Sequence, residues 1–409
     1  MSQLSIYNSL TREKEVFTPI TPGHVGLYVC GPTVSGESHL GHARPYITFD
    51  VVNRYLQFLN YKVRYVRNIT DAGHFEEEGR DATDKVNDKA KLEQLEPMEL
   101  VHKYTNLFHW GMRAFNTLEP SIEPTATGHI IEQISMIKKI IEKGYAYEVN
   151  GSVYFDVKKY AANYPYGKLS GRILDDLLET TRELDGQDEK RNKVDFALWK
   201  AAPPEHIMRW ESPWGEGFPG WHIECTAIAL EYLDPSDFDD SLIDIQGGGS
   251  DLIFPHHEMC AAQAHVITGK QLASTYVHSG MIGLDGEKMS KSKGNLVFVS
   301  RLVASGVDPM AIRWALMSDH YRADRMWSDN VLHKAQLGVS RLKEALGKNN
   351  CAPTKELINS IVIALSDDLD TPHVLSLLNT WSAATLSGAE GGNSEELVIA
   401  LDALLGLKL

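Results

Sequence analysis

The chain has 409 residues, 43% of them hydrophobic and 23% charged, which is enough for a large core and two or three domains. Its formal net charge of -15 does not suit a protein that coats nucleic acid, because phosphate binding needs a basic face, although it leaves room for a local basic patch. The sequence predicts no membrane span and no secretory signal. Its four scattered cysteines form no disulfide framework and favour a reduced, cytoplasmic setting.

A βαβ unit is predicted near the N-terminus. Residues 25–30 (VGLYVC) alternate and are β-branched, which is typical of a strand. Residues 41–60 carry apolar side chains at helical spacing, and residues 61–70 (YKVRYVRNIT) predict a second strand. A strand, loop, helix and strand in this order are the beginning of a parallel sheet.

The rest of the chain is mostly helical, with short strands. The further predicted elements are a mostly helical stretch at 85–145, a strand at 151–157, an exposed polar loop at 182–195, a strand, glycine loop and helix start across 241–258, and helices from about 300 to the end. We therefore expect an α/β catalytic domain at 1–300 with a helical insertion at about 85–145. A small helical domain at 301–409 follows it.

Two histidines stand at the predicted start of the first helix, in the stretch YVCGPTVSGESHLGHARPY. A helix N-terminus presents free N–H groups and the positive end of a dipole, which suits phosphate. His39 and His42 could therefore stabilise phosphate oxygens as charge develops in a transition state. The alternative is a pair of capping or surface histidines. The P-loop pattern is absent, so any nucleotide site here is of another kind.

A second stretch, GEKMSKSKGN at 286–295, forms a cationic loop that can close on a polyphosphate. Alone, it could equally be a solvated basic turn. Together, HLGH after the first strand and KMSKS some 250 residues later resemble the two signatures of the class I aminoacyl-tRNA synthetase superfamily. This resemblance implies a Rossmann-like catalytic domain that makes an aminoacyl-adenylate from ATP, with Mg²⁺ accompanying the ATP.

Within that superfamily, the chain resembles enzymes that activate cysteine. The segments YVCGPTV, VRNITD, YGKLSGR, DFALWK, FPGWHIEC and GGGSDLIFPHHE are similar to cysteinyl-tRNA synthetase, and the likeness covers nearly all of residues 1–300. It implies one zinc ion per chain, held by Cys30, Cys225 and His256. Zinc suits thiolate and imidazole ligands and can also bind the substrate thiolate, so serine would be rejected. Without the resemblance, Cys30 and Cys225 would be interpreted as ordinary buried cysteines.

Position 260 departs from the family pattern, which has a further glutamate ligand there. Cys260 could complete a Cys₃His site, but a closed tetrahedral site is usually structural, whereas a catalytic one keeps a position open. Cys260 therefore either stays off the metal, or it joins or gives way to the substrate sulfur.

The resemblance also implies roles for other residues. The catalytic set is His39, His42, Lys288 and Lys291. The ATP-binding set is Thr33, His39, Gly41, His42, Gly247, Gly248, Gly249, Asp251, Ile282, Lys288, Met289, Ser290, Lys291 and Ser292. The substrate cysteine would contact Cys30, Gly31, Thr33, Thr70, Trp221 and Gln246. Trp221 could instead be a core aromatic.

The acceptor of the cysteinyl group is predicted from the second half of the chain. Gln246 stands where the tRNA synthetase usually has histidine, and the segments HYRADRMWSDNVL, SDDLDTP and LDALLGL are similar to the cysteine ligase of mycothiol biosynthesis. The chain is also acidic and ends about 115 residues after KMSKS. We therefore expect transfer to the amine of glucosaminyl-inositol by a monomer. The alternatives are charging of tRNA-Cys and a non-catalytic paralogue that only binds ligand.

Overall fold

The computed structural model describes most of the chain in detail. The described residues are 3–72, 85–93, 95–174, 176–177, 189–204, 206–234, 241–284, 286–289, 294–348 and 350–409. Within these ranges the side chains of residues 85, 87, 88 and 288 are not described.

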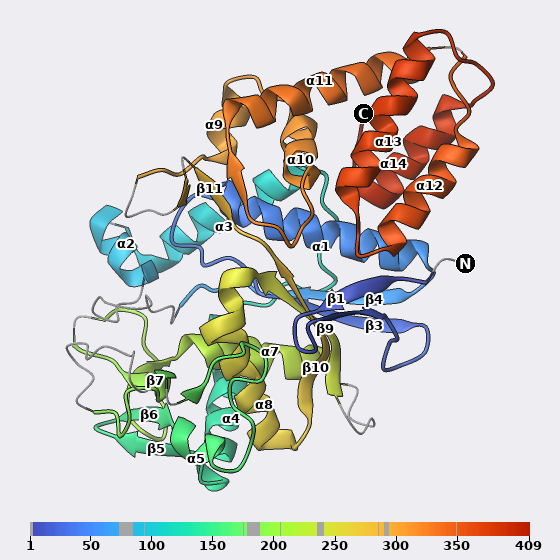
Figure 1. Cartoon of the computed structure of the whole chain (residues 1–409). Helices are drawn as coiled ribbons and strands as arrows, with labels where there is room; N and C mark the ends of the chain where they lie inside the picture. Colours follow the sequence, from blue (N-terminus) through green and yellow to red (C-terminus); the bar gives the residue numbers. More distant parts are fainter. Residues whose placement is uncertain are drawn as a thin grey trace.

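A parallel sheet lies at the centre of the molecule (Figure 1). Its strands, in the spatial order β10-β9-β3-β4, are β10 (Gln271–Ser279), β9 (Ser241–Gly249), β3 (His24–Val29) and β4 (Lys62–Arg67). The three neighbouring pairs are all parallel. Helix α1 (Leu40–Phe58) connects β3 to β4, so the predicted βαβ unit is confirmed.

Helices cover both faces of this sheet (Figure 1). On one face lie α1 and α3 (Pro97–Ala114); on the other lie α4 (Ile130–Glu142), α7 (Trp221–Leu233) and α8 (Glu258–Thr268). Most residues of β9 and β10 and the C-terminal halves of β3 and β4 are buried between these layers.

A second, antiparallel sheet forms a smaller layer beside α4. Its strands, in the order β5-β6-β7-β8, are β5 (Ala146–Val149), β6 (Ser152–Phe155), β7 (Phe196–Ala201) and β8 (Gly217–Pro219), and the short helix α5 (Val157–Ala161) follows β6. The strand predicted at 151–157 is thus confirmed. The sheet and α4 share an apolar cluster that includes Ile137, Phe155 and Trp199.

The polar loop predicted at 182–195 is partly wrong. Residues 182–188 lie outside the described residues, but Asp195 is buried rather than exposed. Its carboxylate accepts hydrogen bonds from the hydroxyl of Tyr147 at 2.7 Å and from the backbone N–H of Val157 at 3.0 Å. A carboxylate with these partners can be buried, because its oxygens are satisfied. The polar composition of this stretch therefore led to a wrong prediction for Asp195, which is buried and holds the chain in place through hydrogen bonds.

The stretch predicted as helical at 85–145 contains α2 (Lys85–Glu93), α3, the short 3₁₀ turn η1 (Thr127–His129) and α4. Between α3 and η1 the chain is extended beside β4, where Val66 pairs with Ile122 and Ile69 pairs with Thr125. The segment therefore passes from one face of the parallel sheet to the other. The domain boundaries at 85–145 and 300 stay predictions.

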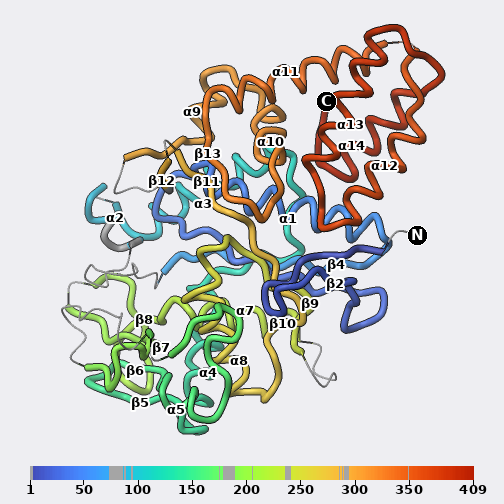
Figure 2. Tube along the Cα trace, in the orientation of Figure 1, coloured from blue at the N-terminus to red at the C-terminus, as the bar shows by residue number. Residues whose placement is uncertain are grey.

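Short strands precede and interrupt the C-terminal helices (Figure 2). The N-terminal strands β1 (Ser5–Asn8) and β2 (Glu13–Val16) form a hairpin, and β11 (Ile282–Leu284), β12 (Glu287–Lys288) and β13 (Arg325–Trp327) form a three-stranded sheet. The prediction of helices alone after residue 300 is thus wrong at β13. Three residues are too few to interrupt a helical pattern, and parallel pairing with β11 decides their conformation.

The C-terminal helices pack on the α/β part. They are α9 (Val299–Ala304), α10 (Pro309–Met317), α11 (Asp329–Leu346), α12 (Lys355–Ser366), α13 (Thr371–Leu386) and α14 (Ser394–Leu405). One hydrophobic cluster includes Ile47 of α1 and Ile245 of β9 together with Leu378 and Leu401 of these helices. No described helix is both long enough and apolar enough to span a membrane.

A buried ionic network joins α1 to these helices. The guanidinium of Arg313, which is fully buried, donates to the carboxylate of Asp50 on α1. It also donates to the carbonyls of Phe115 at 2.9 Å and Leu405 at 2.7 Å. Arg54 donates to the same Asp50 carboxylate at 2.8 Å. Removing one partner of such a pair would leave a buried charge without compensation, so the network holds the two parts in one arrangement.

Candidate active site and metal centre

The candidate site residues gather at the carboxyl edge of the parallel sheet. Cys30 directly follows β3, Thr70 follows β4, and His278 is the penultimate residue of β10. The backbone N–H of Cys30 donates to the carbonyl of Gly247 at 3.1 Å, which joins the ends of β3 and β9. Ligands of open parallel sheets bind outside this edge, so the positions predicted from sequence lie where the fold favours a site.

Two cysteines and a histidine meet in this place. The Sγ atoms of Cys30 and Cys225 and one ring nitrogen of His256 lie within 4.8 Å of one another, and all three residues are buried. Cys225 lies on the second turn of α7, and His256 lies in the π-type turn η3 (Ile253–His257) before α8. The topology of the fold thus brings together Cys30, Cys225 and His256, which are far apart in the sequence.

The ring of His256 is oriented by two neighbours. Its Nδ1 lies 2.9 Å from Nδ1 of His222, so one nitrogen donates to the other. The indole of Trp221 stacks on the imidazole, with ring centroids 4.4 Å apart and planes 20° apart. Nδ1 is thereby occupied, and Nε2 is the nitrogen available to a ligand. Metal-binding histidines commonly have their second nitrogen held in this way.

The protonation of the three residues follows from their contacts. Burial raises the pKa of the Cys30 thiol well above its ordinary value. A hydrogen bond from Cys30 lowers the pKa of Cys225 well below its ordinary value and outweighs burial. Burial disfavours the charged form of His256, but Cys260 and Cys225 more than offset this and raise its pKa. These directions favour the thiolate form of Cys225, which is the form that binds a metal.

Cys260 lies at the edge of this cluster. It is fully buried on α8, and its Sγ lies 3.8 Å from Nε2 of His256. It is not among the residues whose ligand atoms lie within 4.8 Å of one another, and its thiol donates to the carbonyl of His222 at 3.4 Å. This geometry favours the interpretation that Cys260 stays off the metal.

A second group of buried side chains leads away from Cys30. Its Sγ lies 3.2 Å from Nε2 of His257, which also lies 3.2 Å from Nε2 of Gln246. An amide nitrogen can only donate, so Nε2 of His257 accepts and its proton is on Nδ1. That Nδ1 lies 2.7 Å from Nε2 of His278, and Nδ1 of His278 lies 2.8 Å from Oγ of Ser9. The tautomers are thus fixed from Gln246 through His257 and His278 to Ser9.

The imidazoles of His257 and His278 are both neutral. Burial lowers the pKa of His257 well below its ordinary value, and it lowers the pKa of His278 to about 3. The other amide atom, Oε1 of Gln246, is buried and has no hydrogen-bond partner among the described residues. Buried acceptors are rarely left unsatisfied, so this oxygen is suited to a donor supplied by the substrate.

Asn68 fixes the loop between the ends of β3 and β4. Its Oδ1 accepts from the hydroxyl of Tyr28 at 3.0 Å and from the backbone N–H of Gly31 at 2.8 Å, and its Nδ2 donates to Oγ1 of Thr70 at 3.0 Å. Only glycine fits at position 31, because a Cβ there would lie 1.4 Å from the carbonyl oxygen of Asn68. Thr33 and Thr70 form an isolated β-bridge beside it, and their role in binding the substrate cysteine stays a prediction.

The glycines predicted as a loop belong to a strand instead. Gly247 pairs with Val29 on β3 and Val277 on β10, and β9 continues through Gly249. Their composition reflects close packing, since a Cβ on Gly247 would lie 2.3 Å from the ring of Phe49. Asp251 follows in the 3₁₀ turn η2 (Ser250–Leu252) and is exposed.

At the start of α1 the first signature stretch contacts the segment that follows the second one. His39 is the N-cap residue, and its Nδ1 accepts from the backbone N–H of Gly41 at 3.1 Å. The ring of His42 lies against it, with centroids 3.9 Å apart. The backbone N–H of Leu40 donates to the carbonyl of Val297, shortly after the GEKMSKSKGN stretch, at 3.0 Å. His39 therefore caps the helix and also forms a β-bridge with Phe298, in the segment that follows the second signature.

The KMSKS residues themselves are described only in part. Lys288 ends β12 and pairs with Gly283, while Ile282 and Met289 are buried. Lys291, Ser290 and Ser292 lie outside the described residues, as does the side chain of Lys288. Their predicted roles therefore stay predictions.

Sequence reasoning did not find several residues of the site. These are Ser9, Asn68, His222, His257 and His278. Three of them stood inside segments quoted for the family resemblance, namely VRNITD, FPGWHIEC and GGGSDLIFPHHE. Ser9 and His278 carried no such signal, because only the pairing of distant strands brings them to Cys30.

The fold and the site define a class of protein. The family described as tRNA synthetases class I (C) catalytic domain matches residues 16–337, and the chain belongs to this family. Its α/β architecture with a parallel sheet is the class I synthetase fold, as predicted. The chain is thus a ligase that forms an aminoacyl-adenylate, which was also predicted.

Similar proteins narrow the class further. A Bacteroides fragilis protein named cysteine--tRNA ligase is 54% identical over 391 residues, which cover 92% of this chain and 78% of that protein. A Deinococcus radiodurans protein of the same name is 46% identical over 389 residues, covering 92% of this chain and 76% of that protein. A Mycobacterium tuberculosis methionyl-tRNA synthetase structure has a TM-score of 0.60 at 16% identity, covering 94% and 89% of the two chains, and supports the fold alone.

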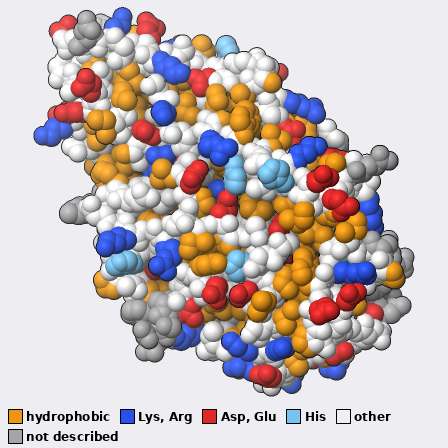
Figure 3. Space-filling model, turned by 180° about the vertical axis from the view of Figure 1, so that it is seen from behind, with side chains coloured by type: hydrophobic (Ala, Val, Ile, Leu, Met, Phe, Trp, Pro, Cys, Tyr) orange, Lys and Arg blue, Asp and Glu red, His pale blue; other side chains and the backbone are white. Residues whose placement is uncertain are grey.

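These relatives overturn the predicted acceptor. Glucosaminyl-inositol was chosen because the chain is acidic and the C-terminal part resembled a mycothiol enzyme. Proteins named for tRNA charging match that C-terminal part too, and nothing in the comparisons favours a mycothiol ligase. The physical error lies in the use of net charge. Over the described face seen in Figure 3, lysine and arginine lie among aspartate and glutamate, so a total of -15 says little about any one contact surface.

Proposed function

We propose that this chain is a cysteine--tRNA ligase, which activates cysteine with ATP and transfers it to tRNA. The observation that carries the proposal is the buried Cys30–Cys225–His256 cluster at the carboxyl edge of a class I synthetase sheet. Relatives of about half-identical sequence that bear this name support it across 92% of the chain. A binding-only paralogue fits less well, because it has no use for both signature stretches.

The donor set of the cluster fits one zinc ion. Two sulfurs and one imidazole nitrogen converge, and His222 occupies the other nitrogen of His256. Three protein ligands leave a fourth position open, which is typical of catalytic zinc. Cys30, Cys225 and His256 would hold the ion, and it would supply a soft Lewis acid that prefers a thiolate to a hydroxyl.

The protein groups around the cluster would hold the rest of the cysteine substrate. Oε1 of Gln246 has no partner among the described residues and would accept from the substrate ammonium. Thr70 accepts a hydrogen bond from Asn68, and Trp221 stacks on the ring of His256. Both residues would therefore lie close to the bound cysteine. Serine lacks the sulfur for which this site is built. Such a site rejects the competitor by leaving its own buried groups unsatisfied.

Adenylate formation would depend on position and charge. The cysteine carboxylate would attack the α-phosphorus of ATP and pyrophosphate would leave; Mg²⁺ bound with the ATP would supply counter-charge. His39 and His42 would stabilise the developing charge at the start of α1, where the helix dipole adds to their effect. Lys288 and Lys291 would act from the other signature. The terminal ribose hydroxyl of tRNA then takes the cysteinyl group and AMP leaves.

The test separates the two steps. Purified protein is assayed for cysteine-dependent pyrophosphate–ATP exchange and, in parallel, for cysteine transfer to total tRNA and to glucosaminyl-inositol. We expect exchange with cysteine but not with serine, and a hydroxylamine-labile ester on tRNA. Exchange that does not depend on cysteine would refute the substrate, and transfer to neither acceptor would refute the ligase.

A further inference from the structure

Arg44 is a buried, charged residue that follows the first signature stretch on α1. It is only 1% exposed, although its side chain is long and carries a charge. Its Nη1 donates to the carbonyl of Met281 at 3.0 Å, and its Nη2 donates to the carbonyl of His320 at 3.0 Å. One guanidinium thus joins α1 to two segments that lie 237 and 276 residues further along the chain.

Neutral groups hold this buried charge. The two hydrogen bonds of Arg44 go to backbone carbonyls, and its Nε has no hydrogen-bond partner among the described residues. Arg54, on the same helix, donates to the carboxylate of Asp50 instead. Burial lowers the pKa of Arg44 to about 10, and Asp319 and Asp324 oppose this shift, so the guanidinium stays charged at neutral pH. A buried charge that meets neutral acceptors is costly, so packing alone does not explain an arginine here.

Met281, the first acceptor, lies where the chain passes from β10 to β11. Its N–H donates to the carboxylate of Asp324 at 2.7 Å, and its carbonyl also accepts from the N–H of Arg325 at 3.0 Å. Strand β11 then pairs with β12, where Gly283 lies opposite Lys288 of the second signature stretch. The guanidinium therefore holds the base of the hairpin that carries the start of this stretch.

His320, the second acceptor, belongs to a segment that is itself fixed. The hydroxyl of the neighbouring Tyr321 donates to the buried carboxylate of Asp368 at 2.6 Å, and the carbonyl of Tyr321 accepts from the N–H of Gly280 at 2.7 Å. A Cβ on Gly280 would lie 2.4 Å from the carbonyl oxygen of Ala323, so the two segments are in close contact. Both acceptors of the guanidinium therefore belong to one tightly joined unit.

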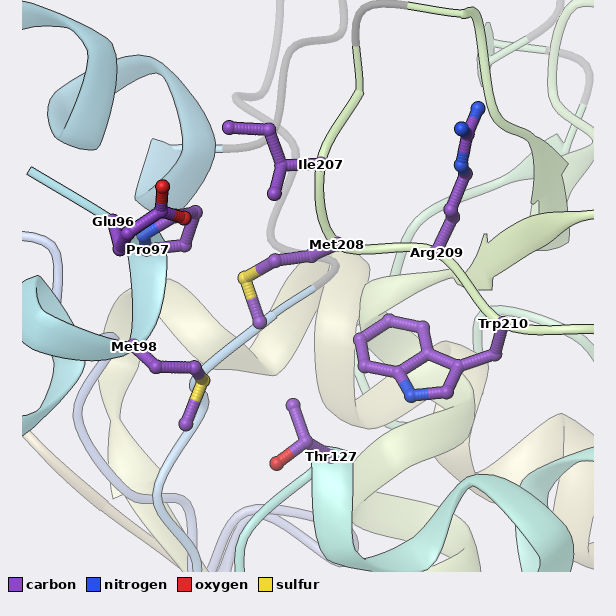
Figure 4. A pocket seen from close by; sticks show the side chains of 8 residues that line it. All are labelled: Glu96, Pro97, Met98, Thr127, Ile207, Met208, Arg209 and Trp210. Carbon is purple, nitrogen blue, oxygen red and sulfur yellow. The ribbon is translucent and has the colours of Figure 1, made fainter.

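This unit is separate from the pocket shown in Figure 4. The residues that line the pocket come from the start of α3, from η1 and from residues 207–210, and they include neither Arg44 nor its acceptors. Helix α1 packs instead against β11 (Figure 2). A change at Arg44 therefore affects the contact between α1 and the hairpin and leaves the lining of the pocket intact.

We propose that Arg44 is a positioning residue, which sets the place of the β11–β12 hairpin relative to the start of α1. This inference rests on the proposed function, in which groups of both signature stretches meet the phosphates of ATP. Arg44 acts through Met281 and does not itself touch ATP. Donors that stabilise a transition state must stand at fixed positions, and a misplacement of about 1 Å can cost roughly 10²-fold in rate.

The experiment separates this role from a purely structural one. Arg44→Lys keeps the buried charge but replaces the planar fork, which reaches two carbonyls, by a point charge on a flexible stem. The matched control is Arg54→Lys on the same helix, where the guanidinium donates to Asp50 and to the carbonyls of Asn116 and Asp402. Pyrophosphate–ATP exchange gives kcat and the KM values for ATP and cysteine, and denaturant unfolding gives the stability of each protein.

We expect both variants to be less stable than the unchanged protein, and only Arg44→Lys to change the kinetics. Its kcat should fall about 10²-fold and its KM for ATP should rise, whereas its KM for cysteine should stay the same, because the cysteine cluster lies elsewhere. Unchanged kinetic constants in folded Arg44→Lys would overturn the inference. An equal rise in both KM values, or a similar kinetic change in Arg54→Lys, would overturn it as well.

A further variant covers the case in which Arg44→Lys does not fold. Asp324→Ala, at an exposed position, removes the hydrogen bond to the N–H of Met281 and should lower kcat by a smaller factor, again without changing the KM for cysteine. An unchanged kcat in this variant would overturn the inference. Lack of cysteine-dependent exchange in the unchanged protein would instead refute the proposed function, and the assay of that protein shows this separately.

Discussion

Two groups of histidines in this molecule differ in burial and in partners. His39 and His42 stand half-buried at the start of α1, with adjacent rings, and His39 accepts a capping hydrogen bond from the backbone of Gly41. His256, His257 and His278 are buried at the carboxyl edge of the sheet, where ring nitrogens contact other side chains at 2.7–3.8 Å. The same residue type is thus set up in two different ways within one site.

The difference follows from what each group would bind. A phosphate group brings its own charge and water, so side chains that meet it need access and a positive environment. A metal ion held by sulfur needs ligands whose tautomers and orientations are set in advance. The buried group gains that order from fixed partners, and burial keeps His257 and His278 neutral.

The largest loss of zinc and of activity should follow a change at the buried cluster that contains His256. Cys225→Ala removes one of three converging ligands, so we expect loss of bound zinc and a fall in cysteine-dependent exchange greater than the roughly 10–100-fold caused by losing an outer partner. Elemental analysis and the exchange assay measure this. Full zinc occupancy in the variant would show that the cluster is not the metal site.

Changes at His39 and His42 should lower the rate of pyrophosphate–ATP exchange without changing the zinc content. His42→Ala removes a group that would stabilise developing charge, so exchange should fall by about 10²–10³-fold. Zinc content should stay at one ion per chain. If the zinc is lost as well, the two groups are not independent and the comparison fails.

His222, which contacts the imidazole of His256, should affect the affinity of the site for zinc. His222→Ala frees Nδ1 of His256, and zinc affinity should fall about 10–100-fold, as when an outer partner is removed. Competition with a chromophoric chelator measures it. His24→Ala, at an exposed histidine that begins β3 at the end of the strand away from Cys30, is the matched control and should leave affinity unchanged.

A smaller effect is expected at Cys260. Its thiol donates to the carbonyl of His222 rather than converging with the other sulfurs, so Cys260→Ser should keep one zinc per chain. Zinc stoichiometry and affinity are compared with those of the unchanged protein. A loss of zinc similar to that in Cys225→Ala would make Cys260 a ligand and close the site.

The smallest effect concerns the stability of α1. His39→Ala removes the N-cap hydrogen bond and should lower the free energy of unfolding by about 1 kcal/mol, whereas His39→Asn can restore a cap. Denaturant unfolding gives both values. If His39 also acts on phosphate, His39→Asn should regain stability but not exchange. Recovery of both would reduce His39 to a capping residue.

Local periodicity predicted the βαβ unit, and the family resemblance alone implied that Cys30, Cys225 and His256 meet. It could not predict the chain from Cys30 to Ser9. A serine after β1 and a histidine at the end of β10 look ordinary until strand order brings them together. Nor could periodicity show β9 continuing through its glycines, since close packing against Phe49 is a tertiary property.

The buried ion pair of Asp50 and Arg313 predicts that the C-terminal helices cannot be removed without unfolding the rest of the protein. The family match ends at residue 337, inside α11, and taken alone it predicts a separable catalytic fragment. A fragment ending there would lack Leu405, whose carbonyl accepts from Arg313, and Asp402, whose carbonyl accepts from Arg54 at 2.6 Å. The helix that begins with His39 would then expose its core face to water. Expression of truncated forms should therefore give aggregates, and heating the whole chain should melt both parts together.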